Sequence, residues 1–436
     1  MSQPHPANRP GPSVRLAWEH THREALPALI LLHKARQRQM SGQMEHLSAL
    51  GQSPVGREVV FLPFFYDDDV RNRYLGQADY QNCWLVNMAW EQMHFACGRG
   101  YLLPDGEFAR ETVLHCAWGE RFEELLIDHG IPKERIRITG HPRFDIYKHT
   151  QLLQSRTELA EPYGLDPDKD WVLVPYNFNM AYISAELRQS LQARGYNLSD
   201  EFIAGFAKAR DAFTEMVRNL ADEFPQTQFI LRVHPAGYEA ESIYQGESRT
   251  RENLFVIADY DIANWVRQAA LTIVWNSTTS MECIVAGKPV VAYEPFPFSE
   301  VFDFDVNRII PNLTKVSDIA DVLRSLPAPG LSYDMDRFQC WYRHQDGKTA
   351  DRLLDIVDEA RLDPERYAVT RPIVEDPRLR AGNRLYSSVS KWPWGKTLLR
   401  TGFGVDRPPR HAPPPTAPLE RAVTELSARP LLDYLR

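Results

Sequence analysis

Residues 271–293 read LTIVWNSTTSMECIVAGKPVVAY, and this stretch decides the fold. An apolar run at 271–275 ends in a turn rich in hydroxyl groups, a helical pattern follows at 279–286, and a second apolar run occupies 289–293. Gly287 directly follows the helical pattern, where a glycine often ends a helix in the left-handed conformation. The order of strand, helix and strand predicts two parallel strands joined by a helical crossover.

The same alternation extends over most of the chain. In the second half, strands are predicted at 171–176, 229–233 and 254–258, and helices at 200–224 and 262–270. In the first half, strands are predicted at 14–18, 58–65, 84–88, 113–118 and 136–139, and helices at 23–38 and 120–129. We therefore predict an α/β protein with two Rossmann-like, doubly wound domains that face a cleft, with ligands at the carboxyl ends of the strands.

The length of 436 residues also favours two domains, because hydrophobic cores stop growing at about 250–300 residues. We predict a disordered N-terminus at 1–13, an N-terminal domain at 14–148, a C-terminal domain at 149–360, and an extension at 361–436 that is rich in proline and arginine. The segment 385–403 alternates basic and aromatic or aliphatic residues. It either contacts a membrane surface peripherally or packs on the second domain.

Composition excludes several classes of protein. Hydrophobic residues make up 43% and charged residues 25%, which is typical of a globular enzyme. A net charge of −8 argues against a nucleic-acid partner. The longest apolar stretch, at 25–32, is far short of the roughly 20 residues of a membrane span, and the start lacks a secretory signal, so we expect a cytoplasmic protein. Five widely spaced cysteines form no metal-binding pattern, and we expect buried thiols and no metal site.

Polar residues end two strands of the predicted second domain. Arg232, His234 and Pro235 lie at the end of one strand, and the other strand is followed by Asn276, Ser277, Thr278, Thr279 and Ser280, which open a helix. Hydroxyls and backbone N–H groups at a helix N-terminus suit a phosphate. The alternative is that Thr279 and Glu282 form a capping box that needs no ligand.

Two carboxylates are candidates for chemistry in the first domain. Glu91 follows a predicted strand, so we expect it on the rim of that domain as the catalytic base, although it could begin a helix instead. Asp145 lies where the first domain hands over to the second, and could act as base or nucleophile or could cap a helix and pair with Arg143.

Three further side chains lie at predicted strand ends or turns of the first domain and are candidates for the acceptor side, together with Arg143: His20, His115 and Trp118. Lone histidines are more often satisfied core or surface groups, so a structural role is the alternative for each histidine. The acidic run at 67–69 is expected to be a solvated loop.

The chain resembles the bacterial surface carbohydrate biosynthesis proteins over roughly residues 14–356. The motifs that carry the resemblance are Glu19-His20, Arg23-Glu24, Trp90-Glu91-Gln92, the segment 115–120, the segment 140–145 and Asp346-Gly347-Lys348. The resemblance implies a GT-B-type, metal-independent glycosyltransferase. By this resemblance the N-terminal domain would bind a glycan or lipid-linked glycan acceptor, and the C-terminal domain would bind a nucleotide-sugar donor. Lys348, on a terminal helix, would contact the donor phosphate.

The second domain is also similar to bacterial sialyltransferases and Kdo transferases, where His-Pro and Ser/Thr motifs hold the CMP of the donor. This similarity implies a CMP-linked, Kdo-like donor, held by His234 and residues 277–280 without any cofactor. The sialyltransferases' acidic-acidic-glycine motif is missing, which leaves the donor sugar open. Alternatives are a polyol-phosphate transferase, a nucleotide-sugar 2-epimerase, and a non-catalytic glycan- or nucleotide-binding subunit of a polysaccharide assembly complex.

Overall fold

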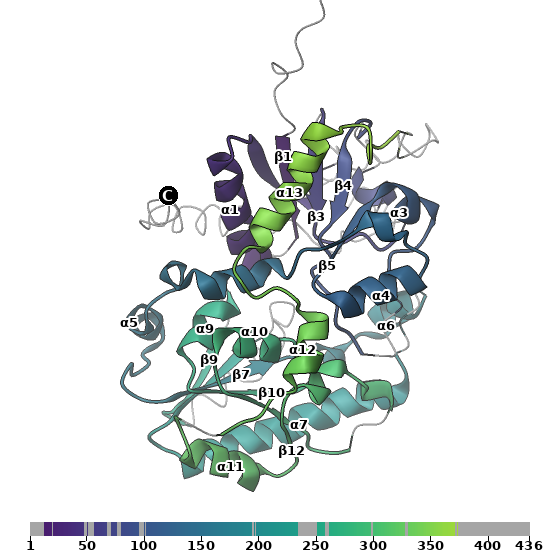
Figure 1. Cartoon of the computed structure of the whole chain (residues 1–436). Coiled ribbons are helices and arrows are strands. Elements are labelled where there is room, and N and C mark those ends of the chain that lie inside the picture. The colour runs from purple at the N-terminus through teal and green to yellow at the C-terminus, as the bar shows by residue number, and fades with distance from the viewer. Residues whose placement is uncertain are drawn as a thin grey trace, which may run out of the picture. The chain divides into compact units, whose positions relative to one another are not determined.

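The computed structural model describes residues 13–19, 21–47, 50, 56–67, 71–75, 80–95, 100, 102–193, 196, 198–233, 251–257, 261–297, 300–327, 330–370 and 373 (Figure 1). The expectations for His20, His234, Pro235 and the segments 1–12, 68–69 and 385–403 lie outside these residues. The chain divides into two compact units. Of the described residues, unit 1 comprises those up to Trp90, those of Pro104–Arg143 and those from Lys348 onward, and unit 2 comprises those of Glu91–Leu103 and Phe144–Gly347.

Unit 1, in its described part, contains a parallel six-stranded sheet with the order β2-β1-β3-β4-β5-β6. The strands are β1 (Ser13–Trp18), β2 (Gly42–His46), β3 (Glu58–Leu62), β4 (Trp84–Asn87), β5 (Leu114–Ala117) and β6 (Ile136–Ile138). The helices are α1 (Thr21–Gln37), α3 (Glu107–Thr112), α4 (Glu120–Asp128) and α13 (Thr349–Leu362). Strands β3, β4 and β5 are mainly apolar and almost entirely buried, as expected for a parallel sheet with both faces covered, and their polar residues are Glu58, Asn87 and His115.

Helix α13 packs on helix α1 (Figure 1). Lys34 on α1 donates from Nζ to Oδ2 of Asp351 on α13 at 2.5 Å, and Arg38 Nη1 donates to Asp355 Oδ1 at 2.7 Å. Because α13 belongs to unit 1, the predicted division that placed residues up to 360 in the second domain needs correction. The partner of α13 lies more than 300 residues away along the chain, and no local pattern reveals it.

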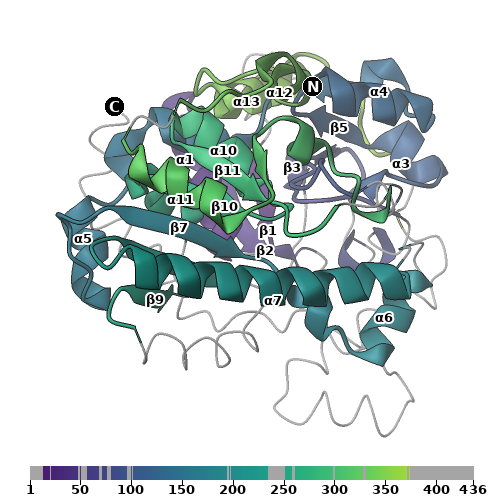
Figure 2. The same ribbon diagram turned by 90° about the horizontal axis from the view of Figure 1, so that it is seen from below.

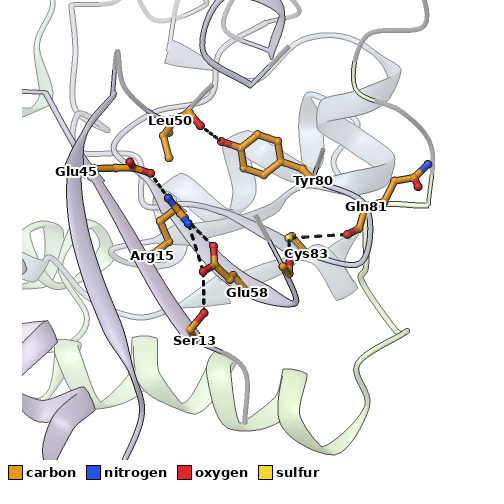
Figure 3. A network of polar contacts seen from close by, with 9 residues as sticks. Ser13, Arg15, Glu45, Leu50, Glu58, Tyr80, Gln81 and Cys83 are labelled. Atoms are coloured by element: carbon orange, nitrogen blue, oxygen red, sulfur yellow. Dashed lines mark hydrogen bonds and ion pairs between the residues drawn. The ribbon is translucent and has the colours of Figure 1, made fainter. Parts of the chain in front are cut away.

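A buried ionic network crosses the first three strands of this sheet (Figure 3). The Arg15 guanidinium on β1 lies between Glu45 on β2 and Glu58 on β3, and its Nε donates to Glu58 Oε2 at 2.6 Å. Ser13 adds a hydroxyl that donates to Glu58 Oε1 at 2.8 Å. Burial lowers the pKa of Arg15, but the hydrogen bonds and charges of the two carboxylates outweigh burial, so the pKa is raised and the guanidinium stays charged.

Unit 2 also contains, among its described residues, a parallel six-stranded sheet, with the order β12-β11-β10-β7-β8-β9. The strands are β7 (Trp171–Tyr176), β8 (Gln228–Val233), β9 (Leu254–Ile257), β10 (Leu271–Val274), β11 (Val290–Tyr293) and β12 (Asn312–Leu313). The helices are α5 (Arg156–Ala160), α6 (Ala185–Gln192), α7 (Asp200–Glu223), α9 (Ile262–Gln268), α10 (Thr279–Ala286), α11 (Val316–Arg324) and α12 (Met335–Trp341). The predicted α/β fold with two doubly wound sheets is therefore confirmed.

The long helix α7 lies along this sheet and supplies much of the core of unit 2 (Figure 2). Its Phe206 and Phe213 are buried in one cluster with strand residues such as Val174 and Phe229. Helix α10 ends at Gly287, whose φ of 66° is left-handed as predicted.

A segment from the first half of the sequence also packs in unit 2. The Phe95 ring lies 5.3 Å from Phe202 and 5.0 Å from Phe304, centroid to centroid. Residues 91–95 have no helical structure, so Glu91 does not begin a helix. Glu91 belongs to unit 2 and not to the N-terminal domain to which the sequence assigned it, because the packing of this segment could not be read from the strand before it.

The cysteine expectation holds in part. Cys83, Cys116 and Cys283 are buried free thiols, and burial raises the pKa of Cys116 and of Cys283 to about 12. Cys340 is exposed, because α12 turns Phe338 and Trp341 inward and Cys340 to solvent. Cys97 lies outside the described residues. None of the helices that the structure describes is both long and apolar enough to span a bilayer.

Candidate functional site

The turn between β10 and α10 is built by its own serine side chains. The Thr279 N–H donates to Ser277 Oγ at 3.3 Å, and the Ser280 hydroxyl donates to the Ser277 carbonyl at 2.7 Å. Thr278, the N-cap residue, makes no side-chain capping bond. Within the described residues, no hydrogen bond engages the backbone N–H of Ser277 or Thr278 or the hydroxyl of Thr278 or Thr279. The turn therefore presents two N–H groups and two hydroxyls at the positive end of a helix.

Glu282 does not complete a capping box. Its buried carboxylate accepts a hydrogen bond from the Tyr147 hydroxyl at 2.6 Å, and the Thr279 N–H that a capping box would use donates to Ser277. Tyr147 lies in the 3-10 segment Pro142–Lys148, 135 residues away. The capping alternative that the sequence left open is thus wrong, and Glu282 instead fixes α10 to this segment.

Two asparagines meet beside the turn. Asn276 follows β10 with a left-handed φ of 44°, and its Oδ1 accepts a hydrogen bond from Asn307 Nδ2 at 2.5 Å. Asn307 comes from the short helix Asp305–Arg308 in the connection between β11 and β12. The sequence pointed to Asn276, whereas Asn307 carries no local signal and was missed.

Arg232 lies on β8, which pairs with β7, and β7 pairs in turn with β10. The carboxyl ends of β8 and β10 therefore share one edge of the sheet, as predicted for the phosphate site. The Arg232 side chain is buried. Lys348 is exposed and belongs to unit 1, whereas the β10–α10 turn belongs to unit 2.

His115 is a core histidine of unit 1 and not an exposed ligand-binding group. One ring nitrogen, Nε2, lies 2.9 Å from the Ala109 carbonyl oxygen, and the other, Nδ1, lies 3.1 Å from Asn87 Nδ2. Nε2 therefore carries the proton, and Nδ1 accepts from the amide. Burial lowers the pKa of His115 to about 4. The expected acceptor-side role is corrected, because both ring nitrogens are used inside the core.

A cluster of aromatic side chains lies at the carboxyl ends of β5 and β6 in unit 1. Trp118 is buried and stacks on His141 with ring centroids 4.0 Å apart, and Trp90 approaches His141 edge-on at 6.0 Å. The Arg143 backbone N–H donates to His141 Nδ1 at 3.2 Å. Burial, and then the charges of Arg143 and Arg23, hold the pKa of His141 well below its ordinary value, so the ring is neutral. The structure thus brings Trp118 and Arg143 together around a histidine that the sequence treated only as part of a motif.

A buried carboxylate occupies the first turn of α1. Glu24 Oε2 accepts from the Glu19 backbone N–H at 2.7 Å, and Glu24 Oε1 accepts from Arg23 Nη2 at 3.0 Å. Burial raises the pKa of Glu24. The motif residues Glu19, Arg23 and Glu24 therefore organise the start of this helix.

The two predicted catalytic carboxylates differ in exposure. Asp145 is only 2% exposed and lies inside the 3-10 segment Pro142–Lys148, whereas the Glu91 side chain is half-buried. Both belong to unit 2. Among the residues described, no group of three or more His, Cys, Asp or Glu side chains is arranged to hold a metal ion.

Comparison with known proteins gives one match to a protein family, over part of the chain, and several matches to solved structures of similar fold. Residues 201–296 match the model of a family described as capsule polysaccharide biosynthesis proteins. This supports the resemblance to surface carbohydrate biosynthesis proteins, and the matched region includes the β10–α10 turn. A search of curated proteins finds no match.

Three solved structures with a similar fold are distant from this chain in sequence. The S. aureus MnaA–UDP complex is 14% identical with a TM-score of 0.50, and the similarity covers 81% of this chain and 97% of MnaA. The wall teichoic acid polymerase TagF is 12% identical with a TM-score of 0.49, covering 80% and 88% of the two chains. The UDP-GlcNAc 2-epimerase of Methanocaldococcus jannaschii is 9% identical with a TM-score of 0.47, covering 80% and 99%. At these identities the comparison concerns the fold alone, which is GT-B-like.

Proposed function

We propose that this chain is a glycosyltransferase that transfers a sugar from a CMP-linked, Kdo-like donor to a surface polysaccharide or glycolipid. The observation that carries the proposal is the β10–α10 turn, where N–H groups of Ser277 and Thr278 and hydroxyls of Thr278 and Thr279 have no partner among the described residues. Such a cluster at a helix N-terminus suits a phosphate. The capsule family match over residues 201–296, which includes this turn, supports the proposal.

In this proposal the turn stabilises the leaving nucleotide. As the acceptor oxygen bonds to the anomeric carbon, the bond from that carbon to the donor phosphate breaks, and negative charge develops on the phosphate. Donors already oriented at that position lower the barrier without reorganising. The base that removes the acceptor proton is Glu91, since its half-buried side chain can reach substrate more readily than the buried Asp145.

Nucleotide binding is the first test. We expect CMP to bind more tightly than CDP, UMP, UDP or GDP in isothermal titration calorimetry, and to raise the free energy of unfolding by about 2.7 kcal/mol at 100 times its dissociation constant. A preference for UDP would favour the nucleotide-sugar 2-epimerase alternative, and a preference for CDP the polyol-phosphate transferase. If none of the five binds, the proposed function is wrong.

Catalysis is the second test, measured as CMP release from a CMP-sugar. We expect Glu91→Gln to keep CMP affinity and to lower the rate of release at least about 100-fold, because the amide keeps the shape but cannot accept a proton. Loss of activity in Asp145→Asn with a normal Glu91→Gln would transfer the role to Asp145. Tight CMP binding without release from any CMP-sugar would instead indicate a non-catalytic binding subunit.

A further inference from the structure

The asparagine pair beside the β10–α10 turn has unused hydrogen-bonding capacity. Asn276 is 5% exposed, and its Oδ1 is taken by Asn307 Nδ2. The other side-chain amide atom of each residue, Asn276 Nδ2 and Asn307 Oδ1, is buried and has no hydrogen-bond partner in the described part of the chain. One is a donor and the other an acceptor.

This result does not depend on how the amides are oriented. If both amides were turned over, Asn276 would donate to Asn307, and one oxygen and one NH₂ group would still be left over. A buried donor or acceptor without a partner costs about 1–3 kcal/mol, and native proteins keep few of them. Asn276 also holds a left-handed backbone, which asparagine adopts more readily than most residues but still at a cost.

We propose that Asn276 and Asn307 bind a hydroxyl group of the sugar-nucleotide donor. A hydroxyl both donates and accepts, so it can bond the free donor and the free acceptor of the pair together. A phosphate oxygen only accepts and would leave the amide oxygen unpaired. The inference rests on the proposed function, because the phosphate held by residues 277–279 would bring the rest of the donor next to Asn276.

The hydroxyl has two sources, the ribose of the nucleotide and the sugar to be transferred. Both offer the same chemistry to an amide pair, and the chain position of Asn276 directly before Ser277 is compatible with each. The two sources are distinguished by comparing the affinity for a bare nucleotide with the affinity for a nucleotide sugar, because a bare nucleotide carries only the ribose hydroxyls.

The test is Asn307→Ala, with affinities for CMP, 2′-deoxy-CMP and CMP-N-acetylneuraminic acid measured by calorimetry. If the ribose is bound, we expect the variant to lose at least about 10-fold in CMP affinity. The affinity for 2′-deoxy-CMP is then unchanged if the pair binds the 2′-hydroxyl, and falls by the same factor if it binds the 3′-hydroxyl. If the sugar is bound, CMP affinity is unchanged and CMP-sugar affinity falls by that factor. Affinities within about twofold of wild type for all three ligands overturn the inference. The asparagine pair would then bind a water molecule or have only a structural role.

Two further variants protect this test. Asn276→Gly removes the other amide and accepts the left-handed backbone, so it carries the test if Asn307→Ala does not fold. Asn264→Ala is the matched control, because Asn264 belongs to α9 and its Oδ1 already accepts a hydrogen bond from the Gln154 backbone N–H at 2.8 Å. We expect that control to keep all three affinities. Wild-type protein that binds no nucleotide would instead refute the proposed function, and this inference with it.

Discussion

Both units contain a parallel six-stranded sheet with polar residues in it or at its edge, but the hydrogen bonding of these polar residues differs between the units. In unit 1, Arg15 is enclosed by Glu45 and Glu58 (Figure 3). His115, in the same sheet, uses both of its ring nitrogens. At the β10–α10 turn of unit 2, by contrast, the Ser277 N–H and an Asn276 amide group have no partner among the described residues. The difference teaches that the polar side chains of the unit 1 network are satisfied within the fold, whereas the β10–α10 turn keeps polar groups for which the described residues supply no partner.

The strongest way to break this comparison is Arg15→Met. Glu45 and Glu58, whose side chains are 16% and 12% exposed, would then face each other without a cation. Removing one partner of a buried ion network costs about 3–5 kcal/mol, so we expect that loss in urea unfolding at pH 7. CMP affinity of the folded fraction should stay at the wild-type value. Unchanged stability would show that the network does not hold the sheet.

A charge at the turn of unit 2 should have the opposite profile. Thr278→Asp places a good N-cap residue before α10, so stability should stay equal or rise, while its negative charge repels a phosphate. We expect CMP affinity to fall at least about 100-fold, which corresponds to roughly 2.7 kcal/mol. Thr278→Asn is the matched neutral control: it also loses the hydroxyl but adds no charge, so its CMP affinity should fall much less than that of Thr278→Asp. Equal binding by both variants would remove the phosphate from this turn.

The smallest effect concerns acid stability of unit 1. The pKa of His115 is about 4 in the folded protein against an ordinary 6.5, so the unfolded chain takes up the proton first and stability falls as the pH drops through this window. Between pH 6.5 and 5.5 this residue should cost about 1 kcal/mol. The matched variant is His115→Gln. The slope of its unfolding free energy against pH should be smaller than that of wild type, by an amount equal to the uptake of at most one proton on unfolding. Parallel pH profiles for the two proteins would contradict a neutral core histidine.

The sequence predicted the elements whose signals are local. Strand β7 (Trp171–Tyr176) and helix α10 (Thr279–Ala286) have the predicted bounds, because continuous apolar runs and a terminal glycine mark them. Strand β2 (Gly42–His46) was not predicted, since GQMEH has neither an apolar run nor a clear alternation. Its place in the sheet comes from pairing with β1.

The candidate site follows the same rule. Residues 276–280 were predicted because a strand end, hydroxyls and a helix start are contiguous in the sequence. The partners that decide what these residues do come from elsewhere in the chain. Tyr147 diverts Glu282 from the capping box, and Asn307 completes the pair with Asn276 from 31 residues away. Spacing alone cannot distinguish a carboxylate that caps its own helix from one held by a distant tyrosine.

The packing of α13 on α1 has a consequence for the protein's synthesis. The ion pair of Lys34 with Asp351 cannot form until the ribosome has added a further 317 residues. At about 5–20 residues per second this takes on the order of tens of seconds. During that interval residues 144–347 emerge without interruption, and the segment 91–103 that joins them in unit 2 has already been made. Unit 1 therefore begins first but cannot acquire α13 until the whole of unit 2 has been synthesised.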